Sequence, residues 1–205
     1  MKGLLLLILL TIATSGFGIN ASDSSGVPKF VESQLKLRPQ LFVPIQFAGN
    51  IGWFSTGIGY SAKRDLYQLS FVYGYVPEQV AGIDIHTVTA RNIFHLYRLP
   101  LNEQSVLIPY AAAGVSLEVG GRSFFTLPDN MSPGYYGFPK SLHLIPAIGC
   151  KLRRATPRRS NLKGVELFAE VTTVDVYIWY KTISREVRMP DILSASAGIH
   201  FFPGR

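Results

Sequence analysis

The chain has 205 residues, of which 47% are hydrophobic and 16% charged, and its formal net charge at pH 7 is +7. This apolar content is high for a soluble exported protein. The lone cysteine, Cys150, excludes the internal disulfides on which small secreted domains commonly depend. A basic balance is compatible with nucleic-acid binding, but the export signal described next argues against it. Anionic lipid phosphates are then the expected counter-charge.

The N-terminus has the order of charge, apolar core and small residues that is typical of a secretory signal peptide. Lys2 supplies one positive charge, residues 4–10 are uninterruptedly apolar, and small residues follow. This core is too short to span a bilayer as a helix. We expect cleavage after Ala21, which makes residues 1–21 the signal peptide, with cleavage after Gly18 as the alternative.

The rest of the chain is predicted as a flexible periplasmic lead-in over residues 22–40 and one domain over residues 41–205. Within that domain no segment approaches the roughly 18 uninterrupted apolar residues of a membrane-spanning helix. Instead, about eight stretches alternate apolar residues with small or polar ones, which is the period of a strand with one apolar face. The expected strands are 41–47, 52–61, 66–76, 83–99, 106–119, 142–153, 163–173 and 192–202.

The third stretch shows the alternation most clearly. Leu69, Phe71 and Tyr73 share one parity, while Gln68 and Ser70 occupy the other. The first two stretches are less certain in number, because several glycines lie between residues 49 and 59. They fit either a hairpin with a tight turn at Gly49-Asn50 or one bent strand over residues 47–60.

Eight such strands behind an export signal predict an all-β fold, an antiparallel up-and-down barrel of the outer-membrane type with its apolar parity turned to lipid. If the C-terminus lies in the periplasm, the turns at 62–65, 100–105 and 154–162 are periplasmic. The connections at 48–51, 77–82, 120–141 and 174–191 are then external. The two longest connections both fall outside, as in known outer-membrane barrels.

Several features resemble small bacterial outer-membrane β-barrel proteins. They are the signal peptide, the glycine-rich Ala48-Gly49-Asn50-Ile51-Gly52, and the aromatic strand Phe71-Val72-Tyr73-Gly74-Tyr75-Val76-Pro77. The resemblance implies a bacterial outer-membrane location and, as partners, outer-membrane lipids, lipopolysaccharide and the barrel assembly machinery. That machinery often reads a terminal aromatic residue, whereas Phe202 here precedes three further residues. The resemblance implies no single activity, since such barrels serve as anchors, adhesins, pores and enzymes.

Three sets of residues are candidates for a site. Inward-facing Glu166 and Glu170 are expected to pair with Lys151 and Arg153 and to fill a lumen too narrow for open water. The basic residues of the last external connection are expected to contact lipid phosphates; they are Lys181, Arg185 and Arg188. Aromatic residues of the long external loop suggest a recognition surface for a ligand that the sequence does not identify; they are Phe124, Phe125, Tyr135, Tyr136 and Phe138.

Enzymatic chemistry is the alternative function. The histidines, His86, His95, His143 and His200, lack metal-site spacing, and we expect no metal or cofactor. The His-x-Ser signature of lipid A deacylases is absent, and His86-Thr87-Val88-Thr89 is the nearest sequence. A lumen grouping of Ser194, Ser196 and His200 with Glu166 and Glu170 is a further alternative.

A secreted lipocalin-like barrel that binds a small apolar ligand is the third interpretation. Such a barrel would turn its apolar parity inward, the reverse of the outer-membrane arrangement. Gly52-Trp53 lacks the spacer of a Gly-x-Trp start, and Cys150 has no partner for a disulfide. The leading prediction is therefore a non-enzymatic outer-membrane barrel with a structural or surface-recognition role.

Overall fold

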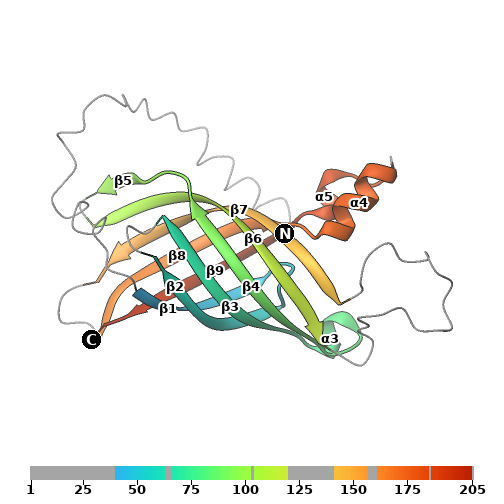
Figure 1. Ribbon diagram of the computed structural model, residues 1–205, viewed down its shortest axis with the longest axis horizontal. Coiled ribbons are helices and arrows are strands. Elements are labelled where there is room, and N and C mark those ends of the chain that lie inside the picture. The colour runs from blue at the N-terminus through green and yellow to red at the C-terminus, as the bar shows by residue number, and fades with distance from the viewer. Residues whose placement is uncertain are drawn as a thin grey trace.

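The computed structural model describes residues 40–62, 66–102, 104–119, 141–156, 161–184 and 186–204, which form a closed β-barrel (Figure 1). Eight antiparallel strands make up its wall, and each pairs with the next along the chain. They are β1 (Gln40–Ala48), β2 (Phe54–Ser61), β3 (Tyr67–Val76), β4 (Ile85–His95), β6 (Ser105–Val119), β7 (Leu142–Ala155), β8 (Leu162–Thr172) and β9 (Ser194–Pro203). Pairing of β9 with β1 and of β4 with β6 closes the ring, so the wall has no free edge.

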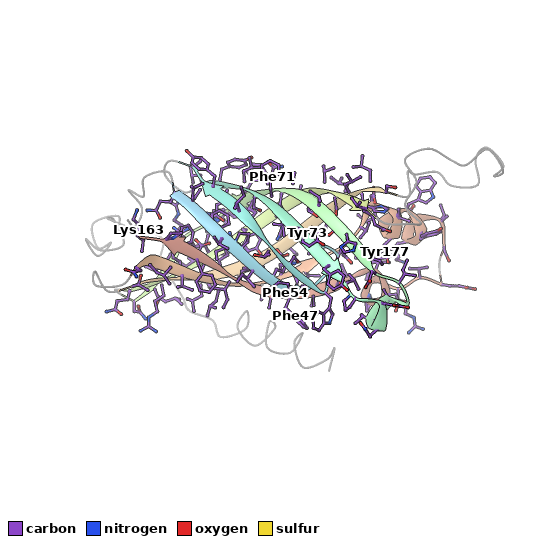
Figure 2. The ribbon with its side chains drawn as sticks, turned by 90° about the horizontal axis from the view of Figure 1, so that it is seen from below. Phe47, Phe54, Phe71, Tyr73, Lys163 and Tyr177 are labelled. Carbon is purple, nitrogen blue, oxygen red and sulfur yellow. The ribbon has the colours of Figure 1, made fainter. Side chains whose placement is uncertain are left out.

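The wall is apolar outside and polar inside, because successive side chains of a strand point to opposite faces. Phe71, Val115 and Leu167 face outward and remain 53%, 47% and 49% exposed. Figure 2 shows Phe71 and Phe47 pointing away from the barrel. Inside lie buried serines, threonines, glutamines and charged residues, interspersed with buried apolar side chains such as Phe42, Ile93 and Phe168. The predicted fold, an eight-stranded antiparallel up-and-down barrel of the outer-membrane type, is confirmed, and the lipocalin-like arrangement is excluded.

Two details of the strand prediction are resolved. The first hairpin is two strands, with Ala48 and Gly49 at positive φ in the turn. The single fourth strand over residues 83–99 is wrong: β4 ends at His95, and a short strand β5 (Leu99–Asn102) then pairs with the start of β6. His95 pairs with Tyr110 and Leu99 with Leu107, so one extra residue bulges between β4 and β5.

Three short helices lie at one end of the barrel, which we call the helical end; β5 and the end of β9 lie at the other (Figure 1). Helix α3 (Glu78–Ala81) connects β3 to β4, and α4 (Asp175–Ile183) and α5 (Met189–Ile192) connect β8 to β9. None of the helices in the described ranges is long and apolar enough to cross a membrane. The signal peptide, nearly all of the lead-in and the aromatic residues predicted at 124–138 lie outside the described residues.

Candidate functional site

The lumen contains a charged cluster around Glu166, which we call the Glu166 cluster. Strand pairing places Glu166 of β8 between Arg153 of β7 and His200 of β9. The Arg153 Nε donates to Glu166 Oε1 at 2.6 Å, and His200 Nδ1 lies 3.0 Å from Oε2. Lys151 Nζ lies 3.6 Å from the same Oε2 and donates to Gln68, a residue of β3 across the lumen. The Glu166 carboxylate thus contacts the cations of Arg153 and Lys151, and the cluster links β7, β8 and β9 to β3 on the opposite wall.

A second cluster surrounds Glu170, which lies four residues after Glu166 on β8 and nearer the helical end. Its carboxylate forms an ion pair with Arg91 of β4. Tyr110 of β6 donates to Oε2 at 2.6 Å and Ser196 of β9 donates to Oε1 at 3.0 Å. Arg91 also donates to Gln46 of β1 at 3.2 Å. This Glu170 cluster therefore joins five strands around the full circumference.

The structure separates the four residues that the sequence analysis grouped together. Glu166 lies beside Lys151 and Arg153, but Glu170 pairs with Arg91 instead. The reason is that its neighbour on β7 is Gly149, which offers no side chain to pair with. A Cβ at Gly149 would lie 2.7 Å from the Glu170 Cβ and 2.8 Å from Tyr110 Cζ. The glycine thus opens the space through which Glu170 reaches across to β4.

Aromatic rings enclose the charged groups and complete the filling of the lumen. The His200 ring stacks on Phe42 at 4.6 Å and contacts Phe168 at 4.8 Å between centroids. The Lys151 ammonium lies over the Tyr110 ring at 4.9 Å. Lys151 and Glu166 are each 0% exposed. Buried charges of this kind are tolerated only when paired and hydrogen-bonded, so the two clusters act as a fixed polar core.

The β1–β2 turn covers the lumen at the helical end. Ile51 is buried against Val72 and Ile145, its carbonyl accepts a hydrogen bond from Thr87, and Asn50 donates to Thr172 at 3.0 Å. The backbone of the turn can fold this deeply because the position beneath it is Gly74. A Cβ at Gly74 would overlap the carbonyl oxygen of Ile51.

We therefore expect Gly74→Ala to displace the turn and to destabilise the barrel by about 1–3 kcal/mol, the usual effect of overpacking. Urea unfolding of the barrel refolded into lipid vesicles measures this loss. Gly114→Ala is the matched control, since it also faces the lumen but its nearest contact would be the Thr89 methyl at 3.2 Å. Equal losses in the two variants would contradict the role assigned to Gly74.

The residues considered for catalysis do not come together. Ser196 donates to Glu170, whereas His200 contacts Glu166, so serine and histidine belong to separate clusters. His86 faces the outer wall, while the Thr87 hydroxyl is turned into the lumen. Val88, at the serine position of a His-x-Ser signature, is apolar and exposed. Within the described ranges, no three His, Cys, Asp or Glu side chains are grouped to hold a metal ion.

Helix α4 presents aromatic side chains at the helical end. Asp175 at its start accepts a hydrogen bond from the Leu144 N–H at 3.2 Å, which fixes the helix to β7. Tyr177, Trp179 and Tyr180 are exposed. Figure 2 shows Tyr177 at the end of the molecule. Of the predicted lipid-phosphate contacts, Lys181 lies on α4 and Arg188 directly precedes α5, whereas Arg185 lies outside the described residues.

Comparison with solved structures finds a chain described as the outer membrane enzyme PagL. The sequences are 12% identical, the TM-score is 0.42, and the match covers 81% of this chain and 99% of that chain. No protein-family model and no curated protein sequence matches the chain.

Sequence reasoning missed Arg91, Tyr110, Gln46 and Gln68 as partners within the lumen. The sequence does indicate them through the alternation of side chains along each strand. Arg91 shares its parity with the inward Thr87 and Thr89 of β4, and Tyr110 shares its parity with the inward Gly114 and Ser116 of β6. Which inward residues meet across the lumen depends on strand tilt and on where glycines leave room, and neither follows from one strand's alternation.

Proposed function

We propose that the protein is an integral barrel of the bacterial outer membrane with a closed lumen, serving as a structural scaffold that presents its helical end outside the cell. The observation that carries this proposal is the inversion of polarity: apolar side chains cover the outer wall, while paired charges fill the interior. A soluble protein places these groups the other way round. Export would depend on residues 1–21, and insertion on the barrel assembly machinery.

The helical end supplies the features expected of a surface-exposed rim. Tyrosine and tryptophan side chains favour the boundary between hydrocarbon and headgroups, and α4 carries three of them. Lys181 and Arg188 lie in the same connection, where they would meet lipopolysaccharide phosphates, together with Arg185. The loop over residues 120–140, with Phe124, Phe125, Tyr135, Tyr136 and Phe138, would add a recognition surface at this end.

Cell fractionation and conductance measurements test the proposal. We expect recovery in the outer membrane and a folded band on gels that shifts on heating, as closed barrels show. In planar bilayers we expect no stable conductance steps, because buried ion pairs occupy the lumen throughout. Persistent single-channel steps would contradict a closed lumen, and recovery in the soluble periplasmic fraction would contradict the membrane location.

Catalysis is tested separately by incubating the purified barrel with labelled lipid A and phospholipid. Since the His-x-Ser position carries Val88 and the lumen serine and histidine are apart, we expect no acyl release. Release that is abolished by His86→Ala or His200→Ala would overturn the non-enzymatic role and leave the scaffold unchanged.

A further inference from the structure

A hollow on the outer wall near the helical end combines aromatic side chains with one carboxylate. It has a volume of about 460 Å³ and is lined by Phe54, Thr56, Tyr73, Tyr75, Asp84 and His86. The lining comes from three neighbouring strands and from the residues that follow α3. In the register, Phe54 pairs with Tyr75 and Tyr75 with His86, so three rings lie in one row across the wall. Figure 2 shows Phe54 and Tyr73 on these neighbouring strands.

Hydrogen bonds hold the rings in place. The Tyr73 hydroxyl lies 2.6 Å from His86 Nδ1, and the two rings are stacked with centroids 5.9 Å apart. The Tyr75 hydroxyl donates to Asp84 Oδ1 at 2.8 Å, and its ring lies 5.2 Å from that of His86. The faces of these rings are electron-rich, so together they form a surface that attracts a cation.

Asp84 places a carboxylate at the edge of this surface. Besides the Tyr75 hydroxyl, its Oδ1 accepts the backbone N–H of Glu78 at 2.9 Å. The hydrogen bond from Tyr75, and then that from Glu78, lowers the pKa of Asp84 below its ordinary value. Asp84 is therefore ionised at neutral and mildly acidic pH, and it is the one carboxylate among the lining residues.

A carboxylate beside aromatic faces is the arrangement that recognises an ammonium group. The hollow opens to the outer surface of an apolar wall, at the end of β3 where the strand leaves the belt for α3. We propose that the hollow binds a positively charged amine on an outer-leaflet lipid, an amine-bearing lipopolysaccharide, whose acyl chains lie along the outward apolar side chains below it; the short-chain phospholipids used below are soluble probes of the headgroup charge. This inference rests on the proposed membrane location of the barrel.

Binding can be measured in detergent, independently of membrane insertion. The chain has two tryptophans. Trp53 directly precedes Phe54 of the lining, and its backbone N–H donates to the carbonyl of Tyr75, another lining residue, at 3.0 Å. In a Trp179→Phe background, Trp53 fluorescence is titrated with short-chain phosphatidylethanolamine, phosphatidylcholine and phosphatidylglycerol of identical acyl chains. We expect saturable binding of the two lipids with a cationic nitrogen, the ethanolamine and choline lipids, and at least about tenfold weaker binding of phosphatidylglycerol, corresponding to roughly 1.4 kcal/mol.

Asp84→Asn removes the charge but keeps an oxygen that accepts from Tyr75 and Glu78. We expect it to weaken amine-lipid binding about tenfold. Phe54→Leu, which removes one ring and keeps an apolar side chain, should weaken binding severalfold. Asp191→Asn is the matched control, since Asp191 is an exposed carboxylate of the β8–β9 connection at the same end. It should bind like the parent, and the heat shift on gels verifies that each variant is folded.

Equal binding of phosphatidylglycerol, or no change in the folded Asp84→Asn variant, would overturn the amine site. Either result leaves the membrane barrel intact, because insertion and the heat shift are measured separately. Recovery of the protein in the soluble fraction would instead overturn the proposed function, whatever the titration shows.

Discussion

Replacing Glu166 with glutamine is expected to destabilise the barrel by about 3–5 kcal/mol, the usual consequence of removing one partner from a buried ion pair. The substitution preserves volume and removes the charge that lies between Arg153 and Lys151. Both cations are then left in a lumen closed by aromatic rings, where desolvation is not offset. The measurement is urea unfolding of protein refolded into vesicles, compared with the parent.

Two further variants determine what the Glu166 cluster contributes. Glu186→Gln removes an exposed carboxylate and should change the free energy of unfolding by no more than about 0.5 kcal/mol. Combining Glu166→Leu with Lys151→Met and Arg153→Leu replaces the whole charged group by apolar side chains. Such replacements are often neutral or stabilising, so the triple variant should recover most of the stability. If the triple variant is no more stable than Glu166→Gln, the attraction among the charged groups of the Glu166 cluster stabilises the barrel by more than their desolvation destabilises it.

The two clusters occupy different levels of the lumen and share only β8 and β9 among the strands that they join. The Glu166 cluster joins β3, β7, β8 and β9, and the Glu170 cluster joins β1, β4, β6, β8 and β9. The two clusters together thus involve seven of the eight wall strands, and β2 contributes glycine and serine to the wall. A polar core shared by nearly every strand fixes the register around the ring, since a slip of one residue would turn each charged group outward to the belt.

Alternation alone was enough to predict the strands, because one face must meet hydrocarbon and the other a narrow polar lumen. The stretch at 66–76 shows this directly, and its outward Phe71 and inward Gln68 lie as expected. The prediction failed between β4 and β5, where one extra residue bulges between His95 and Leu99. Alternation does not mark a bulge in the sequence, so the predicted fourth strand was continued to residue 99, and a turn was predicted over residues 100–105, where most of β5 lies.

The site depended on features that alternation does not encode. Glu170 pairs with Arg91 because Gly149 leaves space beside it, a relation between three strands. Helix α4 was predicted only as part of a loop, although Val176, Trp179, Tyr180 and Ile183 recur at helical spacing. The hollow around Asp84 depends on the register of β2 against β3 and β4, which sets Phe54, Tyr75 and His86 in one row.

Arginine at Phe71 is expected to destabilise the barrel in vesicles by about 2–4 kcal/mol, the effect of a cation facing lipid near the bilayer midplane. Phe71 lies in the middle of β3, between Ile58 of β2 and Ala90 of β4, and points away from the barrel (Figure 2). In water the same change at a half-exposed position would fall within about 0.5 kcal/mol, because nothing is desolvated. The size of the effect therefore reports which solvent surrounds the wall.

Arginine placed at other depths in the membrane is the internal control for this experiment. Leu66→Arg, just before β3 and far from the helical end, should cost at most about 1 kcal/mol, because a long cationic side chain there reaches the interface. Val80→Arg on α3 lies beyond the wall and should be neutral. Urea titrations of refolded Phe71→Arg, Leu66→Arg and Val80→Arg should thus show decreasing destabilisation in that order. Three equal and small values would mean that the outward face meets water, and the membrane location would then have to be abandoned.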